Sequence, residues 1–122
     1  MSDERIAVGV DLGGTSLLAA AVADDGRVLG RAKRKTRAER GAKEIIKRLE
    51  ESIREALAAA SLGPEDAAAV GVGVPGPLDP STGLVHCCPN LGPSWDNLPL
   101  ADLLGEALGM PVSVENDVNV GA

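Results

Sequence analysis

The segment at residues 41–60 constrains the fold most, because its apolar side chains recur at helical spacing between two groups of strand-like segments. Gly63 and Pro64 follow it, as is common after the end of a helix. A helix of this length predicts a crossover connection, so the strands before and after it are expected to pair in parallel. The apolar positions of the helix are Ile45, Ile46, Leu49, Ile53, Ala56, Leu57 and Ala60.

Five segments around this helix predict strands, of which four are apolar and one, residues 28–36, is polar and rich in lysine. The first three are joined by short turns and are expected to form an antiparallel meander. The fourth and fifth are joined through helices, one of which begins near Pro99, and another helix is expected from Asp117. We therefore predict an α/β fold with one five-stranded mixed sheet and helices on both of its faces. The strand segments are residues 6–12, 17–23, 28–36, 67–74 and 111–115.

Composition narrows the class of protein. The chain has 122 residues, with 44% apolar and 25% charged, as expected of one globular domain. No apolar run approaches the ~18 residues of a membrane span, and the charged residues 1–5 do not resemble a secretory signal. We expect a cytoplasmic protein without a membrane partner. Cys87 and Cys88 are adjacent, so they cannot join distant segments, and they are interpreted as thiols in a reducing compartment.

Charge argues against nucleic acid as a partner. The net charge is −6 and the pI is about 4.7, whereas a phosphate backbone favours basic surfaces. Six of the ten residues at 31–40 are nevertheless basic. This segment is interpreted as a solvated edge strand rather than a nucleic-acid patch, since no aromatic side chain lies within it for stacking on bases.

Three segments follow apolar strands and are candidates for a ligand site, because open α/β sheets bind ligands beyond the carboxyl ends of their parallel strands. These are residues 11–15, 75–77 and 115–117. In the first, Gly13 and Gly14 are expected to leave backbone N–H groups free to bind phosphate, and Thr15 adds a hydroxyl. Asp11 is negative like phosphate, so a cation such as Mg²⁺ is implied between them. The alternative is a hairpin that needs glycine only for its turn.

Other residues have structural alternatives. Residues 71–76 match G-x-G-x-x-G, but prolines follow and no helix opens there, so a dinucleotide site is rejected. Asp117 could cap a helix, or it could accept a proton from a substrate hydroxyl. His86, the sole histidine, and Trp95, the sole aromatic residue, are interpreted as structural.

Four motifs in order along the chain resemble a known family. The VGVDLGGT sequence at residues 8–15 resembles the first phosphate loop of actin-like ATPases and sugar kinases. Residues 72–79, residues 89–91 with Trp95, and the PVSVENDVN sequence at residues 111–119 resemble the ROK family of repressors, open reading frames and kinases. Bacterial glucokinases are its commonest enzymes.

This resemblance implies a ribonuclease H-like fold of the actin-like type, with residues 1–122 as a single amino-terminal lobe whose carboxyl-terminal lobe is absent. It implies a glucokinase-like enzyme of glycolysis that uses ATP and Mg²⁺ and transfers phosphate to a hexose, most simply glucose. The implied positions are Asp117 as the catalytic base, Gly76, Asn90 and Asn116 at the sugar, Gly13, Gly14 and Thr15 at the phosphates, and Asp11 near the Mg²⁺ ion.

Some features of the family are not found in this sequence, and two further expectations follow from this. The zinc cluster, the Glu/His sugar ligands, the second phosphate loop and the adenine pocket of the family belong to its carboxyl-terminal lobe, so this chain alone is expected to be inactive. No helix-turn-helix precedes Ile6, which favours a kinase over a repressor. The alternatives are a non-catalytic or engineered lobe that associates with itself and the sugar-sensing lobe of a repressor. A homodimer is expected, because an isolated lobe would expose apolar surface.

Overall fold

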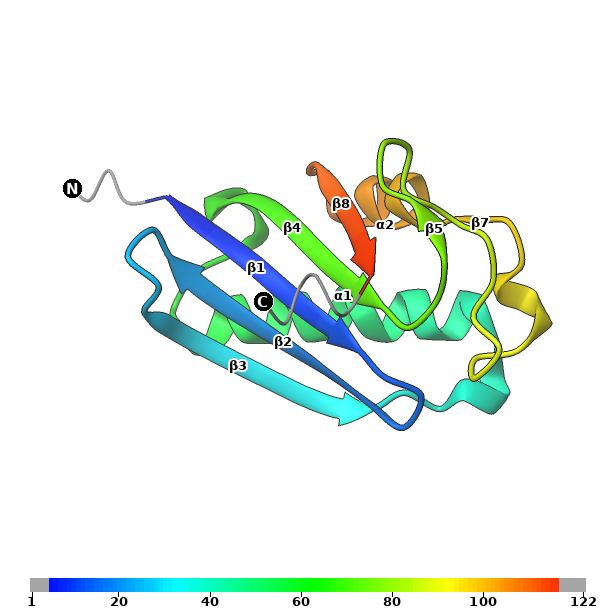
Figure 1. Ribbon diagram of the computed structural model, residues 1–122. Helices are drawn as coiled ribbons and strands as arrows, with labels where there is room; N and C mark the ends of the chain where they lie inside the picture. The colour runs from blue at the N-terminus through cyan, green and yellow to red at the C-terminus, as the bar shows by residue number, and fades with distance from the viewer. Residues whose placement is uncertain (1–4, 117–122) are drawn as a thin grey trace.

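The main sheet has five strands in the order β3-β2-β1-β4-β8 (Figure 1). A computed structural model describes residues 5–116 of the chain. Within it, β1 pairs antiparallel with β2 and β2 with β3, while β1–β4 and β4–β8 are parallel. The mixed five-stranded sheet predicted from the sequence is therefore confirmed. The strands are β1 (Ile6–Leu12), β2 (Ser16–Ala23), β3 (Val28–Lys35), β4 (Ala67–Val74) and β8 (Val112–Asn116).

Two α-helices, α1 (Ala42–Ala59) and α2 (Leu100–Leu108), supply the crossovers on either side of β4. The amphipathic pattern of α1 places one row of apolar side chains against the sheet. Its exposed face carries two ion pairs between residues four apart, Glu44 with Arg48 and Glu50 with Arg54. Short 3₁₀ helices lie at Ala38–Arg40, Pro64–Asp66 and Pro93–Trp95. The buried residues of α1 are Ala42, Ile45, Leu49, Ser52, Ile53, Ala56 and Leu57.

Both helices pack on the same face of the sheet (Figure 1). In β1, side chains alternate between this buried face and an exposed face that carries Ala7, Gly9 and Asp11. Helices on both faces are thus not observed within residues 5–116, because the two right-handed crossovers run in the same direction across the sheet. The helix expected from Asp117 lies outside the described residues.

A second, three-stranded sheet occupies the excursion between β4 and α2. Its order is β5-β6-β7, with strands at β5 (Leu78–Asp79), β6 (Leu84–Val85) and β7 (Leu98–Pro99). The sequence predicted only one short extended piece at residues 84–88, since two-residue strands carry no detectable periodicity. This small sheet packs beside α2 and β8 and so fixes the segment that precedes Asn90.

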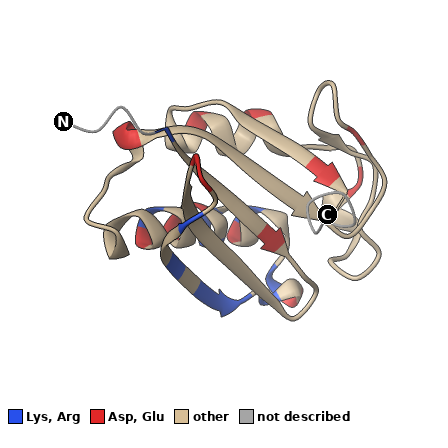
Figure 2. Ribbon diagram, turned by 60° about the vertical axis from the view of Figure 1, so that its left-hand side comes forward, with Lys and Arg blue, Asp and Glu red and all other residues tan. Residues whose placement is uncertain are grey.

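The charged side chains are unevenly distributed, and Lys and Arg gather on the edge strand β3 (Figure 2). Arg31, Lys33 and Lys35 are exposed, as the prediction of a solvated edge strand requires. Arg34 instead turns toward α1 and forms an ion pair with Glu55. Across residues 5–116, no helix is both long and apolar enough to span a membrane.

Strand β3 lies against α1 at Gly30, and this contact carries a first prediction. A Cβ atom at Gly30 would overlap the carbonyl oxygen of Ala56 and lie 3.1 Å from the Cβ atom of Ala59. Gly30→Ala in the 122-residue chain is therefore expected to lower the free energy of unfolding by about 1–3 kcal/mol, because the backbone of α1 must move away. Urea denaturation followed by circular dichroism measures this change.

Gly9→Ala is the matched control for this prediction. Gly9 also lies inside a strand of the same sheet, but a Cβ atom there would meet no described atom within 4 Å. We expect this variant to unfold within about 0.5 kcal/mol of the original chain. Equal stability of the two variants would show that β3 and α1 are not packed this closely.

Candidate functional site

The candidate site lies at the edge of the sheet where the parallel strands β1, β4 and β8 end (Figure 1). Asp11 of β1 lies opposite Gly73 of β4, which in turn lies opposite Glu115 of β8. Val74, the last residue of β4, lies opposite Asn116. The register therefore brings the described residues of the three expected segments to the same end of the sheet, where open α/β sheets bind ligands.

The turn between β1 and β2 is a closed hairpin rather than the expected nest of free N–H groups. The N–H group of Gly13 donates to the carbonyl oxygen of Ser16 at 3.0 Å, so it is not free to bind an anion. Neither Gly13 nor Gly14 has a positive φ. Gly14 and Thr15 are exposed, and their N–H groups donate to no other described residue. The turn thus offers two outward N–H groups and the Thr15 hydroxyl to a ligand.

Thr36 holds this hairpin, and sequence reasoning missed it. Its hydroxyl donates to the carbonyl oxygen of Gly13 at 2.7 Å, and its N–H group donates to that of Thr15 at 2.9 Å. The side chain is fully buried. In the sequence, the sole signal is a β-branched hydroxyl residue at the end of a basic strand.

Asn90 lies beside the hairpin, although 76 positions separate it from Gly14. A Cβ atom at Gly14 would lie 3.5 Å from the Cβ atom of Asn90, which is ordinary van der Waals contact. The turn that carries Asn90 is closed by hydrogen bonds from the N–H groups of Leu91 and Gly92 to the carbonyl oxygen of Cys88. A predicted phosphate position and a predicted sugar position are therefore neighbours.

Gly76 and Asn116 form the second half of the site. The side-chain amide of Asn116 donates to the carbonyl oxygen of Gly76 at 3.4 Å. Gly76 is buried against the segment that leads to Asn90: a Cβ atom there would overlap the carbonyl oxygen of Cys87 and lie 3.0 Å from Cys88 Sγ. Residues 87–90 therefore bridge the two halves, with Gly76 at one end and Gly14 at the other.

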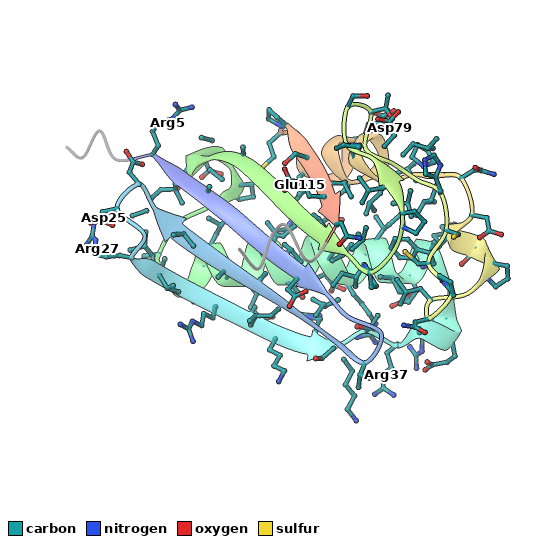
Figure 3. The ribbon with its side chains drawn as sticks, in the orientation of Figure 1. Arg5, Asp25, Arg27, Arg37, Asp79 and Glu115 are labelled. Atoms are coloured by element: carbon teal, nitrogen blue, oxygen red, sulfur yellow. The ribbon has the colours of Figure 1, made fainter. Side chains whose placement is uncertain are left out.

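Two carboxylates lie on the exposed face of the sheet at this edge. Asp11 and Glu115 share a row across Gly73, which has no side chain, and Glu115 is visible on β8 in Figure 3. Asp11 forms no ion pair with another described residue. No group of three or more metal-ligating side chains occurs within residues 5–116. Asp117, predicted as the base, lies outside the described residues.

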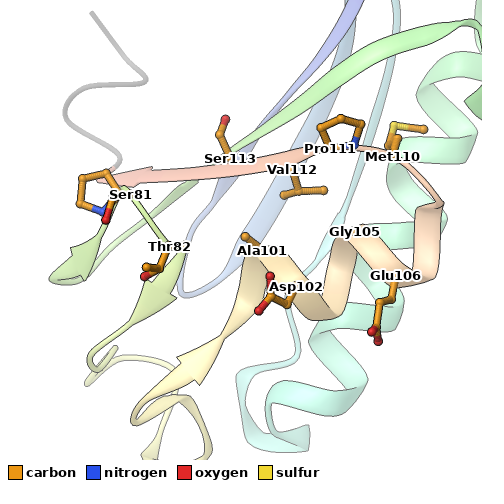
Figure 4. Close-up of a pocket in the computed structure, with 12 residues that line it drawn as sticks. Ser81, Thr82, Ala101, Asp102, Gly105, Glu106, Met110, Pro111, Val112 and Ser113 are labelled. Atoms are coloured by element: carbon orange, nitrogen blue, oxygen red, sulfur yellow. The ribbon is translucent and has the colours of Figure 1, made fainter.

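A cavity of about 410 Å³ adjoins Asn116 and Glu115 and has Pro77, Leu78 and Pro80 as its other walls. A larger cavity of about 550 Å³ lies between α2, β8 and the turn after β5 (Figure 4). The larger cavity contains none of the predicted site residues. The smaller cavity is therefore the one that belongs to the candidate site.

Asp79 fixes the turn beside these cavities. Its carboxylate accepts hydrogen bonds from the Ser81 hydroxyl at 2.6 Å and the Ser81 N–H group at 3.0 Å. These bonds, the hydroxyl first, lower the pKa of Asp79 below its ordinary value of 3.8. The carboxylate therefore supports the turn above pH 3.8, and this support is lost as the pH falls through the lowered pKa.

Known proteins resemble the chain over most of its length. A profile of the ROK family matches residues 7–122. The glucokinase of Thermotoga maritima is 42% identical over 112 residues, which cover 92% of this chain and 33% of that protein. A ROK family glucokinase from Streptomyces griseus, solved in complex with glucose and AMPPNP, superposes with a TM-score of 0.82 at 33% identity. That match covers 93% of this chain and 34% of the glucokinase.

A repressor is also related. The xylose repressor of Caldicellulosiruptor bescii is 31% identical over 78 residues, which cover 64% of this chain and 19% of that protein. The chain spans about a third of the length of the glucokinases that it matches.

The sheet order and the strand-end site define a lobe of the actin-like, ribonuclease H-like fold, which ROK sugar kinases share. Within that class, the chain belongs to the ROK family.

Proposed function

We propose that this chain is the amino-terminal, sugar- and phosphate-binding lobe of an ATP-dependent hexose kinase that acts on glucose. The observation that carries the proposal is the convergence of the hairpin at Gly14, the Asn90 turn and the Gly76–Asn116 pair at one edge of the sheet. A phosphate-binding turn beside sugar-binding residues suits phosphoryl transfer, because the catalysis of this reaction consists mainly of positioning an acceptor against phosphate and neutralising charge.

Each residue of the site has a proposed role. Gly76, Asn90 and Asn116 bind the sugar hydroxyls, and the Gly14 and Thr15 N–H groups with the Thr15 hydroxyl bind phosphate. Gly13 closes the turn through its bond to Ser16. Asp117 accepts the proton of the attacking hydroxyl.

Asp11 is the residue that would hold Mg²⁺. Its exposed carboxylate fits this role, since Mg²⁺ is usually held by one or two carboxylates together with substrate phosphates and water. The ion would supply charge neutralisation for the phosphates.

The test is a phosphorylation assay on the full-length protein with ATP, Mg²⁺ and a panel of hexoses. We expect turnover of glucose, and we expect the 122-residue chain by itself to show none. Absence of turnover for every hexose with the full-length protein would contradict the proposal. ATP-dependent turnover by the short chain, abolished in Asp117→Ala, would contradict the need for a second lobe.

The second candidate function is the sugar-sensing lobe of a repressor, which the similarity to the xylose repressor supports. Sequence-specific DNA binding that a sugar abolishes, without phosphorylation of that sugar, would favour the repressor function.

A cytoplasmic location and a homodimer that includes the edge around Gly13, Gly76 and Asp117 also stay predictions. Light scattering at micromolar concentration tests the dimer, and a monomer mass would contradict it.

A further inference from the structure

Thr36 directs both of its hydrogen-bond donors to the candidate phosphate-binding hairpin. Among residues 5–116, the polar side chains that are fully buried are those of Thr36 and Ser52. The Thr36 hydroxyl donates to the Gly13 carbonyl at 2.7 Å, and the Thr36 N–H group donates to the Thr15 carbonyl at 2.9 Å. Thr36, directly after β3, thus binds the hairpin on both sides of Gly14, through its hydroxyl on one side and its backbone N–H group on the other.

The planarity of the peptide bond fixes the direction of the Gly14 N–H group relative to the Gly13 carbonyl. The Gly13 carbonyl and the Gly14 N–H group belong to one peptide unit, and in a planar trans peptide these two groups point in opposite directions. Because the Gly13 carbonyl points at the buried Thr36 hydroxyl, the Gly14 N–H group points away from Thr36. Gly14 is exposed, so its N–H group is accessible to a ligand.

The backbone next to Thr36 is bound by a side chain of α1. The guanidinium of Arg48 donates to the carbonyl oxygen of Lys35 at 3.2 Å, and Glu44 lies 3.5 Å from that guanidinium. After Thr36, Arg37 adopts a left-handed φ of 59° and turns the chain away beside the hairpin (Figure 3). The hydroxyl therefore sits on a backbone that is anchored on one side and sharply turned on the other.

We propose that Thr36 is a positioning residue for phosphate binding, which orients the Gly13–Gly14 peptide unit so that the Gly14 N–H group meets the phosphate. This inference rests on the proposed function, because it assigns the hairpin to phosphate. Packing alone does not need the hydroxyl, since valine would fill the same volume. What valine cannot supply is the hydrogen bond that fixes the direction of the Gly13 carbonyl.

The test compares Thr36→Val, which removes the hydroxyl, with Thr36→Ser, which keeps it. In the full-length protein, Thr36→Val is expected to weaken ATP binding about three- to tenfold, the usual value of one hydrogen bond. Thr36→Ser is expected to bind ATP within about twofold of the wild type, and the KM for the sugar should change little in either variant. Calorimetry measures the Kd for ATP, and steady-state kinetics gives the KM for the sugar.

A second readout separates positioning from simple stability. Hydrogen exchange at the Gly13 amide, which donates to Ser16 in the closed hairpin, should be faster in Thr36→Val than in the wild type and unchanged in Thr36→Ser. Ser52→Ala is the control: Ser52 is also fully buried, its hydroxyl has no partner among the described residues, and it lies on α1. This variant should leave both ATP affinity and loop exchange unchanged.

The outcomes separate the two proposals. If the wild type phosphorylates a hexose but Thr36→Val binds ATP as the wild type does, the role of Thr36 is overturned and the kinase stands. If the wild type phosphorylates no hexose but binds ATP, and Thr36→Val weakens that binding while Thr36→Ser does not, the role of Thr36 stands and the kinase fails. A wild type that binds no ATP overturns both.

Discussion

Replacing Asp117 by Asn in the full-length protein is expected to lower kcat by ~10²–10⁴-fold, the usual contribution of a general base. The amide is nearly isosteric with the carboxylate, but it cannot accept the proton of the attacking sugar hydroxyl. Because charge and positioning at the other site residues are untouched, the KM values for ATP and sugar should change much less than kcat. Steady-state kinetics with ATP and glucose provides the measurement.

Asp24→Asn is the matched control for this variant. Asp24 is exposed in the turn between β2 and β3, at the opposite end of the sheet from the site, and its replacement makes the same chemical change. It should leave kcat unchanged. Equal thermal unfolding of the three proteins would establish that neither change disturbs the fold. A loss of kcat smaller than tenfold in Asp117→Asn would rule out Asp117 as the essential base.

Gly76→Ala is expected to damage both the fold and the sugar site. The new Cβ atom would overlap the backbone carbonyl of Cys87, which cannot move aside as a flexible side chain can. We expect the free energy of unfolding to fall by about 3 kcal/mol, at the upper end for overpacking. Since the Asn116 amide binds the Gly76 carbonyl, the KM for the sugar should also rise roughly tenfold in the full-length protein.

Gly71→Ala tests whether the effect is specific to that contact. Gly71 belongs to the same glycine-rich segment, yet a Cβ atom there would lie 3.6 Å from Ser113 Oγ, an ordinary contact distance. In the 122-residue chain, its stability should stay within about 0.5 kcal/mol of the original. If Gly76→Ala is as stable as Gly71→Ala, the close approach of residues 76 and 87 is wrong.

The sequence predicted the framework well where the signal is local. Residues 41–60 carry a helical repeat, and the structure has α1 at Ala42–Ala59. Glycines and carboxylates directly after apolar strands predicted a ligand edge at the carboxyl ends of the parallel strands, and Asp11, Gly76 and Asn116 lie at this edge in the structure. Such features could be predicted because strand ends, helix periods and turn residues are each determined by neighbouring positions in the chain.

Contacts between distant residues could not be predicted in this way. The bond from Thr36 to Gly13 joins positions 23 residues apart, and no spacing rule links a β-branched hydroxyl residue to a turn in another strand. The sequence left the phosphate nest and the closed hairpin at Gly13 as alternatives for a related reason: two glycines permit several turn geometries, and the pairing of β1 with β2 selects one. The restriction of both helices to one face follows from crossover direction rather than from any side-chain pattern.

Trp95 gives this chain an unusually simple optical signal. The chain has one Trp and no Tyr or Phe, so its near-ultraviolet absorption and intrinsic fluorescence arise almost entirely from one indole ring. That ring is fully buried in the loop that also carries Asn90, five positions earlier. A shift of the emission toward longer wavelength would therefore report that water reaches this ring. Without any added label, fluorescence from the chain can follow the surroundings of the loop at residues 90–95.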